Sequence, residues 1–421
     1  MATVTTELPL AGAGALVQEQ QSESDQVSQW TLMRWRFLQN RLSVVALILL
    51  LVMYIVAAIA PFIAPNDFND LDTDHSFAAP TSIVFRNAWP SVCPLTQTLD
   101  PNNFKWLYES DCERAVPIRL FVHGASYKLL WVFPTDVHLF GVVDVPPPPK
   151  AAPTAARTAA SDSVSSLLAG LGGQNVSGAV SAQAAAQTNK PPKLFLFGAD
   201  QQGRDLFARV LEGSRVSLTI GIVGVALSLI IGSILGAFSG YMGGAVDDVI
   251  QRTIEIIRAV PTLPLWAAFA AALPRTTTVT QRYLMITLVL SLIGWTGLAR
   301  ELRGKVLAYR SLDFISAARL AGSSHLRIVM SHMLPNAASH IIVVATLAVP
   351  ASILGETALS FLGLGMLPPA VSWGTLLRDT QQIQSVLVHP WMLLPAGPVI
   401  VAVACYFLLG DGLRDAIDPY S

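Results

Sequence analysis

The feature that most constrains this chain is a set of long runs of apolar residues. The first run covers residues 44–64 and contains 21 consecutive uncharged residues. A helix of about 20 apolar residues crosses a hydrocarbon core of about 30 Å. Five more runs are candidates for the same role: residues 216–240, 254–273, 283–299, 336–356 and 391–410. The sequence therefore predicts an all-α membrane protein with six transmembrane helices.

The composition indicates that much of the chain lies in lipid, and it argues against several classes of function. Of its 421 residues, 52% are hydrophobic and 13% are charged, whereas soluble domains carry roughly 25% charged residues. The net charge of −1 gives no bulk attraction for nucleic acid. The three cysteines form no CxxC pair, so we expect no metal site. No GxxxxGK[ST] motif occurs, so the chain itself is not expected to be an ATPase. We expect it to be no enzyme and to contain no catalytic residues.

Two of the apolar runs have internal features that bear on packing. Glu255, Arg258, Pro261 and Pro264 interrupt the start of the third run, which makes it the weakest candidate. The second run carries small residues that allow helices to approach closely. These are Gly221, Gly224, Gly232, Gly236 and Gly240.

The positions of basic residues predict the orientation of the spans. Arg34, Arg36 and Arg41 precede the first run, which places residues 1–43 in the cytoplasm as a leader. Six spans then return the C-terminus to the cytoplasm. The loop 300–335 must also be cytoplasmic, and its excess of arginine agrees with this.

The segment between the first two spans falls outside the membrane. Residues 65–144 mix aromatic and charged residues, as expected for a small folded periplasmic insert, while residues 145–193 are rich in Pro, Ala, Ser and Gly and predict a flexible linker. Cys93 and Cys112 would form a disulfide in an oxidising exterior, or else remain two unpaired thiols. The remaining residues, 194–421, would hold five spans.

Residues 197–218 carry balanced charges, with apolar residues recurring at near-helical spacing. This pattern predicts an amphipathic helix at the outer membrane surface, with Gly203 or Asp205 near its start.

Four stretches together resemble a known family. They read GADQQGRDLFARVLEGSRVSL, SAARLAGSSHLRIVMSHMLPN, ETALSFLGLGMLPPAVSWGTLL and LLGDGLRDAIDP. In this order they resemble the permease subunit of a binding-protein-dependent bacterial ABC importer. The match is best with the "C"-type subunit of the dipeptide, oligopeptide and nickel branch. The resemblance covers about 197–421 and implies the type I importer permease fold in the inner membrane. The exterior insert between helices 1 and 2 is longer than is usual in this family.

The second of these stretches is similar to the family's EAA loop, a coupling helix that docks on a cytoplasmic ATPase. The resemblance assigns ATPase coupling to seven residues: Ser316, Ala317, Ala318, Arg319, Gly322, Leu334 and Pro335. Small side chains would let backbones approach, Arg319 would pair with acidic groups of the partner, and Pro335 would start the next span. Gly322 would turn the helix where a Cβ atom would clash. Two departures are Ser316, where the family has Glu, and His332, where it has Ile.

The resemblance implies a substrate class and a set of partners. The chain would import dipeptides or oligopeptides by alternating access, with nickel, a glutathione-like thiol or another small solute as alternatives. Its partners would be a homologous second permease, two ATP-binding cassette subunits and a periplasmic or lipid-anchored solute-binding protein. ATP and Mg would bind to the ATPase subunits, and this chain would bind no cofactor.

Glu356 is an ionisable residue near a span end, where such groups are functional candidates. It is predicted to begin the outer loop and to act in gating or in contact with the binding protein. Two other classes of protein compete with an importer. A secondary transporter would need carboxylates in mid-membrane, and a membrane receptor would need a cytoplasmic signalling domain; the sequence indicates neither.

Overall fold

The structure is a computed structural model that describes residues 29–86, 88–99, 106–130, 132–142, 193–274 and 276–417. The chain forms two compact units. The helical unit comprises the chain up to Ile55, Ser214–Arg378 and Pro395 to the C-terminal end. The insert unit comprises Val56–Gly213 and Asp379–Leu394. Each unit is described by itself.

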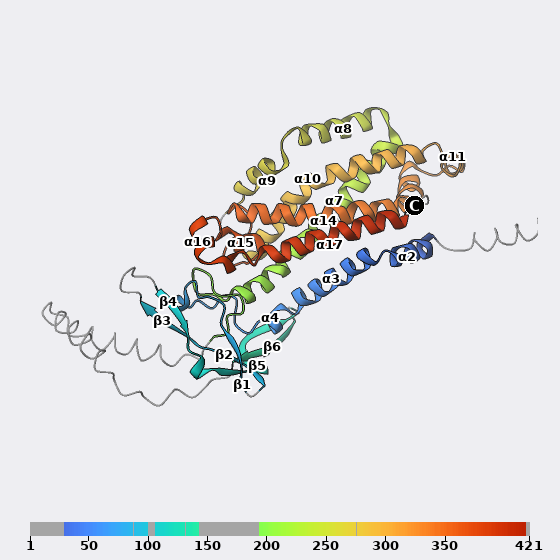
Figure 1. The fold of residues 1–421 in the computed structure, drawn as a ribbon. Helices are drawn as coiled ribbons and strands as arrows, with labels where there is room; N and C mark the ends of the chain where they lie inside the picture. Colours follow the sequence, from blue (N-terminus) through green and yellow to red (C-terminus); the bar gives the residue numbers. More distant parts are fainter. Residues whose placement is uncertain are drawn as a thin grey trace, which may run out of the picture. The chain divides into compact units, whose positions relative to one another are not determined.

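Five helices of the described chain are long and apolar enough to cross a membrane (Figure 1). They are α3 (Arg41–Ala58), α7 (Leu206–Met242), α10 (Val279–Tyr309), α14 (Ala338–Phe361) and α17 (Ala396–Ile417). A sixth crossing is formed if the bent pair α8 (Gly244–Ala259) and α9 (Thr262–Ala271) counts as one span. The short helix α2 (Gln29–Gln39) precedes α3 and packs against α17. The helical membrane architecture predicted from the sequence is confirmed, with five candidate spans, or six if the bent pair is counted as one.

The third predicted span, residues 254–273, is wrong as a single straight helix. The axes of α8 and α9 differ by 85°. Val260 and Pro261 between them have extended backbone, with ψ of 134° at both residues. Proline disfavours helical backbone in the residue before it, so α8 has to end here. Pro264 lies in the first turn of α9, where a missing N–H is tolerated.

The predicted surface helix 197–218 is also wrong as a separate element. Helix α7 begins at Leu206 and continues for 37 residues through the predicted second span. Asp205 caps it, because its Oδ1 accepts the N–H of Phe207 at 3.0 Å. Gly203, with a φ of 72°, turns the chain just before this cap.

The glycines of α7 lie in close helix contacts, and this prediction is confirmed. A Cβ atom at Gly236 would lie 2.5 Å from the carbonyl oxygen of Ala299 in α10, and one at Gly221 would lie 2.7 Å from Cγ1 of Ile353 in α14. Backbones this close leave no room for a side chain, so small residues are required at these crossings.

The insert unit contains two antiparallel sheets, a feature that composition did not specify. One sheet has the order β1 (Ile83–Arg86), β2 (Trp89–Val92), β5 (Val116–Leu129), β6 (Phe133–Val142). The other pairs β3 (Leu95–Leu99) with β4 (Trp106–Ser110). Cys93 and Cys112 form a disulfide. The predicted linker 145–193 lies outside the described residues except for Lys193.

Short elements complete the described chain. They are α4 (Ala60–Ile63), α11 (Asp313–Leu320), α12 (His325–Arg327), α13 (Leu334–Asn336), α15 (Trp373–Arg378), α16 (Ile383–Val388), a π-helical turn (Ile328–Met333) and three 3₁₀ turns (Thr73–His75, Cys112–Arg114, Pro390–Leu393).

Candidate functional site

The segment 313–336 folds into several short helical pieces between α10 and α14. Helix α11 ends at Leu320; Ala321 is its C-cap, and Gly322 follows with a φ of 76°. The N–H of Ser323 donates to the carbonyl oxygen of Ala318 at 3.1 Å, and that of Gly322 donates to Arg319 at 3.0 Å. This pair of bonds is the Schellman motif, which ends a helix at a left-handed residue. The chain then turns and re-enters a helix at α12, where the Ser324 hydroxyl accepts the N–H of Arg327.

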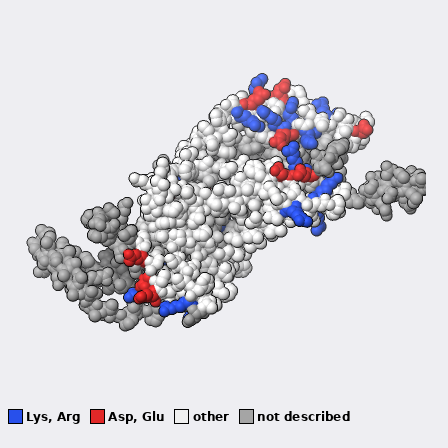
Figure 2. Space-filling model, in the orientation of Figure 1, with Lys and Arg blue, Asp and Glu red and all other residues white. Residues whose placement is uncertain are grey.

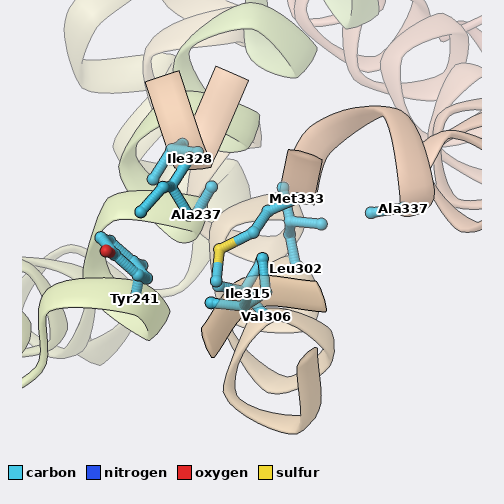
Figure 3. Close-up of a cluster of buried hydrophobic side chains, with 9 residues drawn as sticks. Ala237, Tyr241, Leu302, Val306, Ile315, Ile328, Met333 and Ala337 are labelled. Carbon is cyan, nitrogen blue, oxygen red and sulfur yellow. The ribbon is translucent and has the colours of Figure 1, made fainter. Parts of the chain in front are cut away.

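One face of this segment is buried against the helical unit (Figure 3). Ile315, Ile328 and Met333 are fully buried and pack with side chains of α7 and α10. The partners in this cluster are Ala237, Tyr241, Leu302, Val306, Val329 and Ala337. Burial of each large apolar side chain stabilises the contact by roughly 1.5–3 kcal/mol. The segment is therefore held firmly on two spans.

The rest of the segment is largely exposed and carries several large apolar residues: Phe314, Leu326, Met330 and, most exposed of these, Leu320. Leu320, the last residue of α11, is 91% exposed. The predicted coupling residues surround it on the same segment: Ser316, Ala317, Arg319, Gly322 and Pro335 are exposed, and Ala318 and Leu334 are half-buried. A leucine this exposed is not explained by the packing of the chain itself.

Gly322 is required by backbone conformation rather than by space. Its left-handed φ is costly for residues with a Cβ atom. A Cβ atom there would meet nothing within 4 Å in this chain. The expected steric clash is therefore absent from the chain itself, and the free space lies on the exposed face.

Arg319 contacts an aromatic ring. Its guanidinium carbon lies 5.0 Å from the centroid of the Tyr241 ring, a cation–π arrangement. The Tyr241 hydroxyl lies 3.1 Å from Nδ1 of His325. Tyr241 thus joins α7 to α11 and α12, a role that sequence reasoning missed because 78 to 84 residues separate the partners.

Charged residues gather at the end of the helical unit that carries α11 (Figure 2). An ion pair there joins α8 to α10: Arg303 Nε lies 2.6 Å from Oδ1 of Asp247, and Nη2 lies 2.5 Å from Oδ2. The hydroxyl of Ser239 in α7 also donates to Asp247. Such a bidentate pair fixes both position and orientation. The three helices α7, α8 and α10 are thereby joined at this end.

The prediction that Glu356 begins the outer loop is wrong. Glu356 lies within α14 and is fully buried. Its Oε2 accepts the hydroxyl of Ser217 at 2.9 Å, and its Oε1 accepts that of Ser360 at 2.6 Å. The Ser217 hydroxyl oxygen in turn accepts the N–H of Trp373 at 3.2 Å. In this conformation, the carboxylate joins α14, α7 and α15 and is not exposed to a binding protein.

Replacing Glu356 with alanine should lower the stability of the purified chain. A hydrogen-bonding group left unsatisfied by such a change costs roughly 1–3 kcal/mol, and two serine hydroxyls lose their acceptor here. Thermal unfolding measures the effect. Glu255→Ala is the matched control, because Glu255 is 53% exposed and pairs with the exposed Arg252. Equal melting temperatures for the two variants would contradict the structural role of Glu356.

Known families match most of the helical part of this chain. The model described as binding-protein-dependent transport system inner membrane component matches residues 232–420. The model of the N-terminal TM domain of oligopeptide transport permease C matches residues 28–80. A solved inward-facing conformation of the MetNI methionine ABC transporter aligns at 17% identity with a TM-score of 0.38, covering 50% of this chain and 96% of that chain.

Curated relatives are similar over about half of the chain. The oligopeptide transport system permease protein OppC of Bacillus subtilis (strain 168) is 37% identical over 233 residues, which cover 55% of this chain and 74% of the relative. The protein of the same name in Escherichia coli (strain K12) is 42% identical over 224 residues, covering 53% and 72%. The dipeptide transport system permease protein DppC of Bacillus subtilis (strain 168) is 36% identical over 241 residues, covering 56% and 72%. The chain therefore belongs to the family of inner membrane components of binding-protein-dependent transport systems.

Proposed function

We propose that this chain is a membrane-spanning permease subunit of an ATP-driven importer of oligopeptides or dipeptides, and that segment 313–336 couples it to ATPase subunits. The observation that carries the coupling role is the two-sided construction of the segment. Ile315, Ile328 and Met333 anchor one side to α7 and α10, while Leu320 is almost fully exposed on the other. The peptide substrate is supported by the names of the relatives, which are permease proteins of oligopeptide and dipeptide transport systems.

The anchoring explains how movement would reach the spans. A partner that pulls on the exposed face moves α11, and the buried cluster transfers the displacement to α7 and α10. The Asp247–Arg303 pair would carry α8 with them. ATP binding would close the ATPase pair and bias the bundle toward its outward-facing state, and hydrolysis would reset it. This is a two-state element biased from a remote site.

The proposal requires three kinds of partner at the bacterial inner membrane. They are a homologous second permease, two ATP-binding cassette subunits that bind ATP and Mg, and a periplasmic or lipid-anchored solute-binding protein. The N- and C-termini of this chain would be cytoplasmic. Ser316 is exposed where the related loops carry Glu, so docking here would depend on the apolar Leu320 and on shape rather than on an ion pair.

Gly322→Val tests the coupling role. A β-branched residue at a positive φ is strained by about 1–2 kcal/mol, and its side chain would project into the docking surface. We expect ATP-driven uptake to be lost in vesicles that contain the reconstituted importer, while the variant still inserts and folds. Gly304→Val is the control: Gly304 is exposed in α10, and a Cβ atom there also meets nothing within 4 Å. Normal uptake by Gly322→Val would refute the assignment.

The substrate class is tested in the same vesicles. Radiolabelled dipeptides and longer peptides should accumulate in an ATP-dependent manner, and Ni²⁺ should not. ATP-dependent accumulation of Ni²⁺ without that of peptides would favour the nickel alternative.

The variant Glu356→Gln keeps an acceptor and adds a donor within the buried network, so loss of uptake in this folded variant would indicate that the charge itself acts in gating.

A further inference from the structure

Strand β5 of the insert unit exposes two adjacent large apolar side chains. Leu120 is 58% exposed and Phe121 is 63% exposed. Neighbouring residues of a regular strand point to opposite faces, so one of the two is ordinarily covered. Here both side chains are exposed, and Phe121 has a φ of 54°. Such backbone is rare for a bulky residue and is kept only where the surroundings determine it.

The structure fixes Phe121 to the end of the first span. Its ring centroid lies 6.4 Å from that of Phe62, which belongs to α4. The buried His138 of β6 reinforces this contact: its Nδ1 lies 2.6 Å from the carbonyl oxygen of Ala64, and its Nε2 lies 3.1 Å from that of Ala125 in β5. Figure 1 shows β5 and β6 beside α4, so the hairpin and α4 form one structure.

Chain continuity sets the depth of this contact in the membrane. Helix α3 begins at Arg41, a residue suited to the cytoplasmic interface, and α4 follows it after a single residue. A hydrocarbon core of about 30 Å takes about 20 helical residues, and a count from Ser43 reaches Phe62. Phe62 therefore lies at the outer boundary of the apolar layer. The Phe121 ring, in contact with it, must lie at the same level.

We propose that the Arg119–Phe121 stretch of β5 rests in the outer leaflet of the bilayer, with Leu120 and Phe121 among lipid chains and Arg119 at the phosphate headgroups. The depth of Phe62 favours lipid over a protein occupant. Aromatic residues concentrate at this interface. Exposed arginine extends its charge toward headgroups while its stem lies along apolar surface.

Spin labels at single cysteines test this proposal. The full chain, with Cys405→Ala and the Cys93–Cys112 disulfide intact, is placed with its co-purifying subunits in nanodiscs of phosphatidylcholine and phosphatidylglycerol. Nitroxides are attached at Phe121→Cys and Leu120→Cys, and their collision rates with oxygen and with a water-soluble Ni(II) chelate are compared. We expect oxygen to exceed the chelate several-fold at both positions and a smaller ratio at Arg119→Cys.

Gln201→Cys is the aqueous control, because Gln201 is exposed in the loop before α7. Its label should favour the Ni(II) chelate. High accessibility of position 121 to both reagents would place β5 in water and overturn the proposal. Low accessibility to both would also overturn it, in favour of a protein that covers β5. Retention of the intact disulfide and of the monodisperse elution volume shows that each labelled variant is folded. If Phe121→Cys disturbs the backbone at that position, the accessibilities of the label at position 120 test the same proposal.

Discussion

Replacing Leu320 with serine should weaken the binding of ATPase subunits to this chain by at least tenfold and leave its fold unchanged. Burial of a leucine at an interface contributes roughly 1.5–3 kcal/mol, and about 1.4 kcal/mol corresponds to a factor of ten in affinity. Leu320 is 91% exposed in the chain alone. A change at such a position alters the free energy of unfolding by less than about 0.5 kcal/mol. Titration of purified ATPase subunits onto the chain measures the affinity.

A pair of controls separates docking from folding. Leu387→Ser removes another exposed leucine, 76% exposed, from α16, and should leave ATPase binding unchanged. Ile315→Ala instead removes a fully buried side chain on the same helix as Leu320. Its cost should be about 2–5 kcal/mol in stability. If Leu320→Ser binds the ATPase subunits normally, the docking face does not include this residue.

The sequence predicted the existence of the spans better than their ends. Residues 283–299 mark only the part of α10 that is apolar, whereas the helix runs from Val279 to Tyr309. Hydropathy detects apolar residues, but a helix can continue into a polar segment as long as its backbone hydrogen bonds are made. The capping box of Thr278 and Gln281 starts this helix in a polar segment. The break at Pro261 was visible in the sequence, but the 85° bend depends on packing.

The sequence likewise predicted only part of the candidate site. The motif indicated the small residues and Gly322, whereas Leu320 was not singled out. An eight-residue helix is too short for its periodicity to tell a buried Ile315 from an exposed Leu320. Glu356 was misplaced for a related reason, since a charge normally ends a span. Ser217, 139 residues away, satisfies its carboxylate and lets α14 continue. Contacts between residues so distant in the chain cannot be obtained from local pattern.

The turn before α7 is where a single charge should matter most for stability. Asp200 is 1% exposed, and its Oδ1 accepts the N–H groups of Gln202 at 2.8 Å and of Arg204 at 3.0 Å. Its Oδ2 pairs with the side chain of Arg204 at 2.8 Å and with that of Arg209. The guanidinium groups of Arg204 and Arg209 are 14% and 5% exposed. One carboxylate thus balances two largely buried cations.

Asp200→Asn should open this turn. The neutral amide removes the charge that pairs with both arginines, although Asp379 still attracts Arg209. Removing one partner of a buried ion pair costs about 3–5 kcal/mol. Hydrogen exchange of the backbone over residues 198–209 is the measurement, because it reports local opening without requiring the two units to unfold together. A cost of this size accelerates exchange by at least about a hundredfold.

Asp70→Asn gives the comparison at an exposed site. Asp70 is 54% exposed and pairs with Lys193. In the variant, Lys193 would still pair with Asp72, whose Oδ2 lies 3.0 Å from Nζ. The change should therefore cost less than about 1 kcal/mol in stability. Asp205 lies in the same turn before α7 as Asp200, and burial raises its pKa to about 7. Its charge therefore changes near neutral pH, so all variants must be compared at one pH. Unchanged exchange in Asp200→Asn would mean that the arginines find water or other acceptors once the turn relaxes. The GADQQGRD motif would then act through its glycine turn and its helix cap, and not through its ion pairs.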